Sequence, residues 1–217
     1  MNHPWEAISL TDYENHMKLD SVMQLQAMND VMKAQLFCYP AQTVMILGVA
    51  GGNGLEHVNP DKIKRVYGVD INKAYLAECS RRHPALDGVL ECVCADLTDG
   101  CTQLPNADLV LANLVIEYIG YDCFLTVIRK VAPLIVSCLI QINTDEGFVS
   151  DSPYLHVFDC LESVHRQMCQ NELTEAMENI GYTLASEAEH FLPNGKKFIR
   201  SDFLLSEKAT DRYFEHK

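Results

Sequence analysis

Glycines and carboxylates stand where three runs of apolar residues end. The run Thr43–Leu47 leads into a loop rich in glycine, and the next two runs end at Asp70 and Asp96. Absent side chains let a ligand approach the backbone, and a helix that follows offers free N–H groups. A carboxylate at a neighbouring strand end accepts both hydrogen bonds of a ribose diol. These residue types are typical of a site for a nucleotide-like ligand, and the loop supplies Gly48, Gly51, Gly52 and Gly54.

Each of these residues also has a structural interpretation that needs no ligand. A tight turn from a strand into a helix uses glycine for its backbone freedom. Asp70 precedes a helical pattern that opens at Asn72, and a carboxylate is a common helix N-cap. The series of glycines, Asp70 and Asp96 on three successive strand ends nevertheless favours a ligand site. Asp96 suits an exocyclic amine such as N6 of adenine.

The elements that must position these residues follow an alternating pattern. Helical spacing of apolar residues is found between the predicted strands, notably over Asn72–His83 and Tyr121–Val131. Strands that alternate with helices predict a parallel, doubly wound α/β sheet with right-handed connections. The five predicted strands are Thr43–Leu47, Arg65–Val69, Gly88–Cys94, Ala107–Ala112 and Leu134–Ile142.

The two ends of the chain depart from this alternation. Ahead of the first strand, apolar residues keep helical spacing over residues 21–37. After the last parallel strand, a helix over Glu172–Ile180 precedes a strand over Tyr182–Phe191. The pair Asn194-Gly195 then gives a strong hairpin signal. The last two strands are therefore predicted to pair antiparallel.

Composition limits the classes of partner. The 217 residues suit one domain, and 48% of them are hydrophobic, which is enough for a core without disulfides. No apolar stretch is long enough to span a membrane, and the N-terminus lacks the basic and apolar parts of a signal peptide. We therefore expect a cytoplasmic protein. With 17 basic and 30 acidic residues the formal net charge is −13, which repels nucleic acid and favours a small neutral or cationic ligand.

The spacing of cysteines and histidines gives no metal site. The nine cysteines are scattered, and Cys92 and Cys94 alone stand close together. On a strand these two share a face, as small buried apolar residues do. The histidines show no pairwise ligand spacing. We therefore predict no bound metal.

Four motifs that occur in order resemble those of a known family. The segments "ILGVAGGNG", "VYGVDIN", "VCADLTD" and "ADLVLANLVIEYI" resemble the class I S-adenosylmethionine-dependent methyltransferases, from about Thr43 to Leu205. The resemblance implies a Rossmann-like, doubly wound sheet of seven strands, mostly parallel with an antiparallel C-terminal hairpin strand and helices on both faces. It also implies S-adenosylmethionine as cofactor, S-adenosylhomocysteine as product and methyl transfer to a small-molecule acceptor.

The resemblance implies roles for residues at the strand ends. Asp70 would hold the ribose hydroxyls, Asp96 would face the adenine amino group, and Leu97 would lie beside the ring. Asn113 begins the loop where the family's backbone meets the methionine end of the cofactor. The full set of implied cofactor residues is Ala50, Gly51, Gly52, Asn53, Gly54, Asp70, Ile71, Asp96, Leu97 and Asn113.

Two residues depart from the family pattern. Gly48 stands where the family usually has an acid that orients the methionine portion, and Ala50 replaces the first glycine. This departure raises a second hypothesis, a non-catalytic regulatory protein that binds the cofactor. A polyamine-type aminopropyl transferase and a nicotinamide-dependent enzyme are further alternatives. The segment "ANLV" stands in place of the N-P-P-Y-like signature of enzymes that methylate amide or adenine amines, which argues against such substrates.

Methyl transfer is an in-line displacement for which the protein mainly supplies alignment and exclusion of water. A nucleophile that carries a proton also needs a base, and Glu117, Tyr118 and His156 are the candidates. Glu117 has the alternative interpretation of a solvated acid, and Tyr118 that of a packed aromatic. The candidate substrate residues are Tyr13, His16, Met17, Tyr39 and Tyr154.

We predict a single domain over residues 1–217. An N-terminal helical cap is expected over residues 1–40 and a Rossmann-like core over residues 41–217. A substrate lid is expected near residues 143–160, after the fifth strand. The protein is expected to be a monomer or a homodimer.

Overall fold

The computed structural model describes residues 3–143 and 147–206. Residues 1–2 of the expected cap, 144–146 of the expected lid and 207–217 of the expected core lie outside the described residues. Within the described ranges, no helix is both long enough and apolar enough to cross a membrane.

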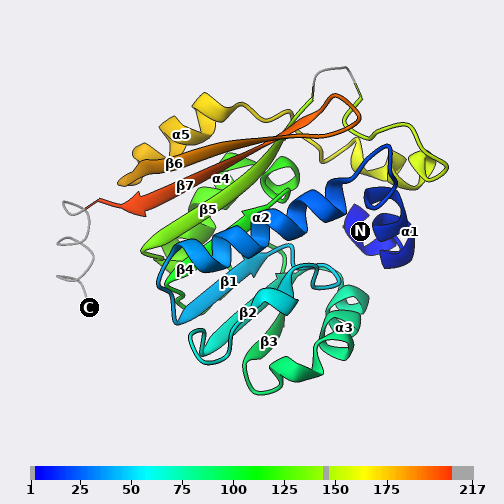
Figure 1. Ribbon diagram of the computed structural model, residues 1–217. Coiled ribbons are helices and arrows are strands. Elements are labelled where there is room, and N and C mark those ends of the chain that lie inside the picture. The colour runs from blue at the N-terminus through cyan, green and yellow to red at the C-terminus, as the bar shows by residue number, and fades with distance from the viewer. Residues whose placement is uncertain (1–2, 144–146, 207–217) are drawn as a thin grey trace.

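A sheet of seven strands in the order β3-β2-β1-β4-β5-β7-β6 forms the centre of the molecule (Figure 1). Its first five strands pair in parallel, whereas β7 is antiparallel to both β5 and β6. The predicted fold class is thereby confirmed. The strands are β1 (Thr43–Leu47), β2 (Arg65–Asp70), β3 (Leu90–Cys94), β4 (Leu109–Asn113), β5 (Ile135–Ile142), β6 (Tyr182–Phe191) and β7 (Lys197–Leu205).

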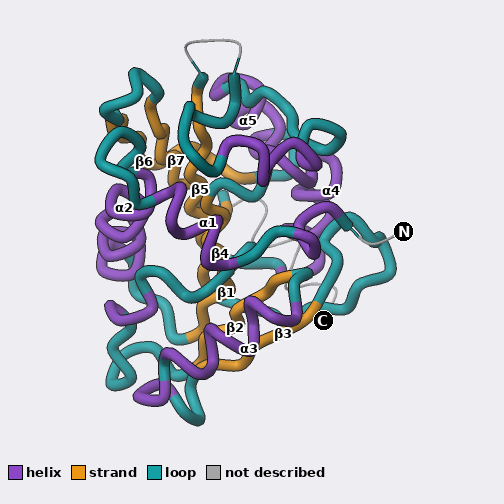
Figure 2. The backbone as a smooth tube through the Cα atoms, turned by 90° about the vertical axis from the view of Figure 1, so that its right-hand side faces the viewer, coloured by secondary structure: helices purple, strands orange, loops and turns teal. Residues whose placement is uncertain are grey.

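Helices cover both faces of this sheet, as Figures 1 and 2 show. Alternate residues of β1 enter two separate cores, because successive side chains of a strand point to opposite faces. Val44 and Ile46 pack with α2 and α3, while Met45 and Leu47 pack with α4 and α5. A strand buried on both faces must be apolar throughout, which explains the unbroken run. The helices are α2 (Gln24–Cys38), α3 (Lys73–Arg82), α4 (Ile116–Val131) and α5 (Gln170–Glu178).

The hairpin between β6 and β7 forms at the predicted Asn194-Gly195 pair. Gly195 has a φ of 80°, and its N–H donates to the carbonyl of Leu192 at 3.1 Å. The side-chain oxygen of Asn194 accepts from the backbone N–H of Lys196 at 3.1 Å. This turn brings β7 back between β5 and β6, so the antiparallel end of the sheet is confirmed.

Helix α4 begins at Ile116, which is five residues before the predicted start at Tyr121. Gly120 interrupts it with φ 75° and ψ 165°, a conformation outside the helical region. The predicted helix corresponds to the part after this kink. The residues before the kink form a separate first turn, which carries Glu117 and Tyr118.

The N-terminal residues pack against the segment that follows β5. The 3₁₀ helix η1 (Pro4–Ala7), helix α1 (Leu10–Met17) and the 3₁₀ helix η4 (Leu155–Leu161) meet at one end of the sheet (Figure 1). Ile8 and Phe158 are buried in the small apolar cluster that they share. This cluster lies apart from the two cores of the sheet.

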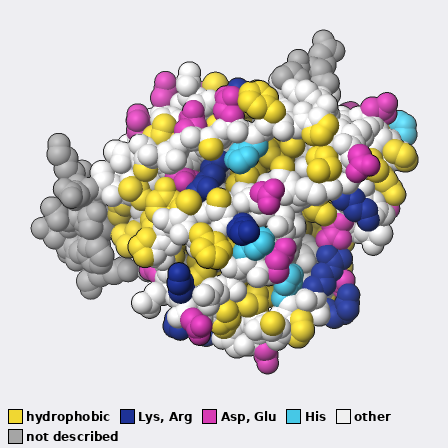
Figure 3. All heavy atoms as spheres, in the orientation of Figure 1, with side chains coloured by type: hydrophobic (Ala, Val, Ile, Leu, Met, Phe, Trp, Pro, Cys, Tyr) yellow, Lys and Arg dark blue, Asp and Glu magenta, His cyan; other side chains and the backbone are white. Residues whose placement is uncertain are grey.

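The charged side chains on the face shown in Figure 3 are mixed. Lys and Arg lie there in small groups among acidic, hydrophobic and other side chains. This face therefore has no continuous basic surface to offset the formal net charge of −13.

Candidate functional site

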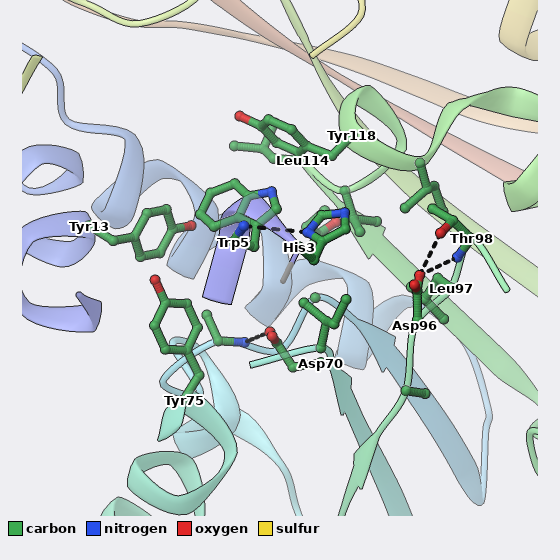
Figure 4. A pocket seen from close by; sticks show the side chains of 17 residues that line it. His3, Trp5, Tyr13, Asp70, Tyr75, Asp96, Leu97, Thr98, Leu114 and Tyr118 are labelled. Atoms are coloured by element: carbon green, nitrogen blue, oxygen red, sulfur yellow. Dashed lines mark hydrogen bonds between the residues drawn. The ribbon is translucent and has the colours of Figure 1, made fainter. Parts of the chain in front are cut away.

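A cavity lies at the carboxyl edge of the parallel strands (Figure 4). It has about 670 Å³ of open space, its mouth included. We call it the strand-end cavity, because the ends of four adjacent strands form its floor. These ends contribute Gly48 and Ala50 after β1, Asp70 and Ile71 at β2, Asp96 and Leu97 after β3, and Asn113 at β4.

Asp70 is held in place by backbone amides. Its Oδ2 accepts from the N–H of Ala50 at 2.9 Å, and its Oδ1 accepts from the N–H of Asn72 at 2.8 Å. Burial raises the pKa of Asp70, and these hydrogen bonds oppose the rise. The N-cap of α3 is Asn72, whose Oδ1 accepts from the N–H of Ala74. Asp70 therefore ties the loops after β1 and β2 together, and each carboxylate oxygen retains a second lone pair.

Asp96 stands on the other side of the strand-end cavity (Figure 4). Its Oδ1 accepts from both the N–H and the hydroxyl of Thr98, at 2.8 and 2.6 Å. Every hydrogen bond found for its side chain among the described residues goes to Oδ1. Buried Leu97 and half-buried Ile71 supply apolar surface to the same cavity.

The side chain of Asn113 is used within the protein. Asn113 and Gln35 of α2 exchange two amide hydrogen bonds, each 2.9 Å long. Gln35 also donates to the hydroxyl of Ser137 at 2.9 Å. All three side chains are buried. Asn113 thus has its amide committed to α2, and its place in the cavity wall is fixed by this pairing.

Tyr39 belongs to the same network of side-chain hydrogen bonds, at the end far from Asn113. Its hydroxyl donates to Asp202 at 3.0 Å, and Asp202 also accepts from Ser137 and from Arg200. Burial, and then Asp202, raise the pKa of Tyr39 to about 12. Tyr39 does not line the strand-end cavity, nor does it line a second cavity that adjoins the first. The structure therefore places this expected substrate residue in a structural network.

Gly51 makes room for an ion pair. A Cβ at this position would lie 2.5 Å from Oε1 of Glu14 and 2.7 Å from Nη1 of Arg82. Glu14 and Arg82 pair at 2.5 Å and so join α1 to α3. The absent side chain at Gly51 therefore accommodates the protein's own N-terminal helix.

The other residues of the loop are also packed against the protein. A Cβ at Gly52 would lie 2.6 Å from Nε2 of His83, and one at Gly54 would lie 2.8 Å from Sδ of Met32. Asn53 donates to a backbone carbonyl of α2 at 2.9 Å. Gly51, Gly52, Asn53 and Gly54 are not among the residues that line the strand-end cavity.

Gly48 and Ala50, by contrast, do line the cavity, and both have left-handed backbone conformations. Gly48 has a φ of 69°, and a Cβ there would lie 3.3 Å from Val115. An acid at this position would be strained, which gives a physical reason for the departure from the family pattern. Ala50 has a φ of 47°, a conformation that costs an alanine about 1 kcal/mol.

The N-terminal segment forms one wall of the strand-end cavity. His3 and Trp5 both line it, and Figure 4 shows their rings between Tyr13 and Leu97. Asn72 donates to the carbonyl of Trp5 at 3.0 Å, which fastens the segment to the start of α3. The hydroxyl of Tyr75 makes a second such contact one turn later, to a backbone carbonyl at 2.9 Å.

A second cavity, the aromatic cavity, lies beside the first and has about 530 Å³ of open space. The two cavities share Trp5, Tyr13, Leu114 and Tyr118. The rings of Trp5 and Tyr118 meet edge to face with centroids 4.9 Å apart. The remaining walls include His16 and Met17 from α1, Glu117 from α4, and Phe148, Phe158 and His165 from the segment after β5.

Glu117 is the acid of the aromatic cavity. Its side chain is only 3% exposed, and its Oε1 accepts from the N–H of Gln141 at 2.9 Å. Its Oε2 is buried and has no hydrogen-bond partner among the described residues. Burial raises the pKa of Glu117 from 4.5 to about 7. A carboxyl with such a pKa, beside an open cavity, has the properties of a general base at neutral pH.

The other titratable groups of the aromatic cavity are neutral at pH 7. Burial, and then the charge of Lys196, lower the pKa of His165 to about 4. The same two causes lower the pKa of His16, whose Nδ1 lies 2.8 Å from the hydroxyl of Ser152. Burial, and then Glu117, raise the pKa of Tyr118 well above its ordinary value.

The structure brings most of the expected catalytic and substrate residues together, but three lie elsewhere, namely Tyr39, His156 and Tyr154. The ring of His156 is 90% exposed and lies 3.2 Å from Asp159, outside both cavities. Tyr154 packs in the small cluster of η4, also outside both cavities. Over residues 3–143 and 147–206, no group of three His, Cys, Asp or Glu side chains is arranged to hold a metal ion. The expected residues around the aromatic cavity are Tyr13, His16, Met17, Glu117 and Tyr118.

Several residues of the two cavities were missed from the sequence. Trp5 is the single tryptophan of the chain, and it precedes every periodic element. An isolated large aromatic in a polar segment is a signal that could have been used. His165 and Phe148 stack at 4.1 Å, but nothing in the sequence indicates that pairing.

Residues 46–133 match the family model of the methyltransferase domain. The matched segment runs from β1 to the end of α4, so it includes every strand end in the floor of the strand-end cavity. This segment is therefore similar to a methyltransferase domain, in agreement with the family predicted from the four motifs. No curated protein gives a significant match to the sequence.

Solved structures of similar fold include methyltransferases from bacteria. The N-methyltransferase NodS of Bradyrhizobium japonicum, in complex with S-adenosyl-L-homocysteine, is 13% identical, with a TM-score of 0.65 over 91% of this chain and 98% of that chain. The magnesium protoporphyrin IX methyltransferase ChlM of Synechocystis, with bound SAM, is 11% identical, with a TM-score of 0.59 over 88% and 83%. The [4+2]-cyclase SpnF is 9% identical, with a TM-score of 0.63 over 85% and 83%. At these identities the comparison concerns the fold of the methyltransferase domain.

Proposed function

We propose that this protein is a methyltransferase that uses S-adenosylmethionine and transfers its methyl group to a small-molecule acceptor. The observation that carries the proposal is the strand-end cavity, in which Ala50, Asp70 and Asp96 from adjacent strand ends face one space. A bare backbone turn and two separated acids are the groups that an adenosine needs.

The residues of the strand-end cavity fit this cofactor. Each oxygen of Asp70 accepts one backbone N–H and has a lone pair left for a ribose hydroxyl. Asp96 would accept from the adenine amino group, with Leu97 and Ile71 against the ring. The side chain of Asn113 is committed to Gln35, so we expect its contribution to the methionine end through the backbone.

When bound, the cofactor supplies a methyl group on a sulfonium, which is a good electrophile for an in-line displacement. The protein's own contribution is alignment, exclusion of water and removal of a proton. Trp5 and Tyr118 line both cavities, and Glu117 of the aromatic cavity would accept the acceptor's proton. A buried carboxyl beside the cofactor cavity favours turnover over the alternative of a non-catalytic binding protein.

Calorimetric titration with S-adenosylmethionine and S-adenosylhomocysteine tests this proposal. We expect saturable binding of both to the wild-type protein. Asp70→Asn should weaken binding by about 1–3 kcal/mol, the usual loss when polar groups are left without their partners. The matched control is Asp87→Asn, which removes the same charge from an exposed site and should bind normally. Failure of the wild-type protein to bind either compound would refute the proposal.

We also propose a cytoplasmic setting for the reaction. The net charge of −13 disfavours nucleic acid as a substrate. We propose a small molecule as the acceptor and a monomer or homodimer as the active form.

A further inference from the structure

The carboxyl of Glu117 lacks a partner that its burial requires. Oε1 accepts one backbone N–H, from Gln141, and the buried Oε2 accepts none within residues 3–143 and 147–206. No Lys, Arg or His of that described part forms an ion pair with it. A buried carboxylate without a counter-ion is unstable in the folded protein. Oε2 of Glu117 therefore needs one further partner, either a positive charge or a hydrogen-bond donor.

The walls around this carboxyl suit a cation. The aromatic cavity is lined by the rings of Trp5, Tyr13, Tyr118, Phe148 and Phe158. The faces of such rings attract cations, while their bulk favours an apolar body behind the charge. An anion would meet both the ring faces and Glu117, and would be repelled.

Among the described residues, no other ionised side chain lines the aromatic cavity to compete for a cation or to offset Glu117. The titratable groups that interact electrostatically with Glu117 are neutral acids at pH 7: Tyr13, Tyr118, Tyr121 and Cys138. The cavity's histidines, His16 and His165, have lowered pKa values and are neutral as well.

Lys196, whose charge acts on both histidines of the cavity, already has its own partners. Nζ of Lys196 donates to the carbonyl of Gly147 and lies 3.3 Å from Oδ1 of Asn143. None of the ion pairs found among the described residues joins it to Glu117, and its positive charge acts on the two histidines. A ligand must therefore bring the missing positive charge.

The position of the carboxyl is suited to a methyl acceptor. Tyr118, the neighbour of Glu117, and Trp5 border both cavities. A nitrogen bound at Glu117 in the aromatic cavity would therefore lie in a space that shares these walls with the strand-end cavity.

We propose that the aromatic cavity binds a small primary or secondary amine as an ammonium ion on Oε2 of Glu117, and that this amine is the methyl acceptor. The inference rests on the proposed function, which it extends by naming the class of acceptor. One buried carboxylate matches one ammonium group, so a monoamine with an apolar body is the expected ligand.

The residues then account for each proton and electron pair. The ammonium gives one proton to Oε2 of Glu117, which frees the lone pair on nitrogen. That lone pair forms the new N–CH₃ bond, and the electrons of the broken C–S bond stay on sulfur. The products are the methylated ammonium and S-adenosylhomocysteine. Glu117 returns its proton to water when the product leaves.

The test is calorimetric titration of the protein, saturated with S-adenosylhomocysteine, with amines and with neutral analogues of the same shape. The probes are benzylamine and n-butylamine, each matched by its alcohol, and benzoate. We expect each amine to bind about tenfold or more tightly than its alcohol, because a buried charge pair is lost in the alcohol complex. Benzoate should not bind. Amine affinity should rise with pH through about 7, as Glu117 ionises.

Two variants separate the role of Glu117 from a general effect of charge. Glu117→Gln keeps the shape of the side chain but should remove the preference for amines, their pH dependence and methylation of the amine, while alcohol binding stays unchanged. Glu162→Gln removes an equal charge from an exposed site on the same side of the molecule and should behave as the wild type.

The outcomes distinguish this inference from the proposed function. If the wild-type protein binds S-adenosylhomocysteine but prefers neither amine over its alcohol, or if Glu117→Gln retains the preference, the amine inference is wrong and the methyltransferase proposal stands. If the cofactor product itself does not bind, the methyltransferase proposal fails first.

Discussion

Glu117 combines two properties that rarely occur in one side chain. It is almost fully buried, and its Oε2 nevertheless has no partner among the described residues. Such a carboxyl costs the folded protein stability whenever it is ionised. The cost is typical of functional sites, where a group is prepared for a ligand at the expense of the fold.

This cost predicts how stability depends on pH. The pKa of Glu117 is about 7 in the folded protein and about 4.5 in the unfolded chain. Between these values the folded state holds a proton that the unfolded state has released, so the free energy of unfolding falls as pH rises. The fall from Glu117 begins near pH 4.5, ends near pH 7 and amounts to about 3 kcal/mol.

Urea unfolding of the wild type and of Glu117→Gln, from pH 5 to pH 8, measures this effect. The variant lacks the titrating group, so it should gain stability over the wild type as pH rises and keep a constant advantage above pH 7. A difference between the two proteins that does not change with pH would mean that the carboxyl is not perturbed in the folded state.

The sequence predicts some site residues better than others for a physical reason. Asp70 and Asp96 follow strands, and the edge of a parallel sheet brings such residues together whatever the side-chain packing. Glu117 was chosen by its place after a strand, but its burial depends on Gln141 and on residues after β5, which no local pattern reveals. His156 was chosen by its residue type and its place in the expected lid, and its ring is 90% exposed.

At the scale of elements, the kink of α4 decides where Glu117 lies. Gly120 has φ 75° and ψ 165°, a combination that only glycine adopts without strain. It separates the first turn of the helix, which carries Glu117, from the longer part that follows. The carbonyl of Glu117 accepts from the N–H of Arg166, so the turn is also fixed to the segment after β5.

Substitution of Gly120 tests the importance of this kink. Gly120→Ala should lower the free energy of unfolding by about 1–3 kcal/mol, because of its backbone conformation. A Cβ there would also lie 2.6 Å from Nη1 of Arg166, although that flexible side chain can move.

The control for Gly120→Ala is Gly88→Ala, compared by urea unfolding. Gly88 also has a positive φ, of 76°, but a Cβ there would meet nothing within 4 Å. We expect a loss of about 1 kcal/mol at this position. A smaller loss at Gly120 than at Gly88 would show that α4 tolerates a regular helix through the kink.

The elements themselves were largely predictable, and the exceptions share a cause. The parallel strands are apolar runs bounded by turn residues, so their ends were found within two residues. The start of helix α4 was predicted too late in the sequence. Gly120 interrupts the helical pattern, although the residues on both sides of it belong to the helix. The 3₁₀ helices η1 and η4 are too short for periodicity, yet they carry or adjoin walls of both cavities.

At the scale of the whole molecule, the net charge of −13 acts on every ligand that approaches. S-adenosylmethionine carries one more positive charge than S-adenosylhomocysteine, so the field of the protein should favour it. Salt screens such a field. Raising the ionic strength should therefore weaken binding of S-adenosylmethionine more than binding of S-adenosylhomocysteine. Calorimetry of both compounds at low and high ionic strength checks this, and equal changes for the two would contradict it.

The walls that the two cavities share have a consequence for turnover. Trp5, Tyr13, Leu114 and Tyr118 each line both spaces, so a ligand in either cavity meets side chains that also face the other. Any change in affinity that one reactant causes for its companion is then returned by the same factor. The affinities for donor and acceptor should accordingly depend on the same four side chains.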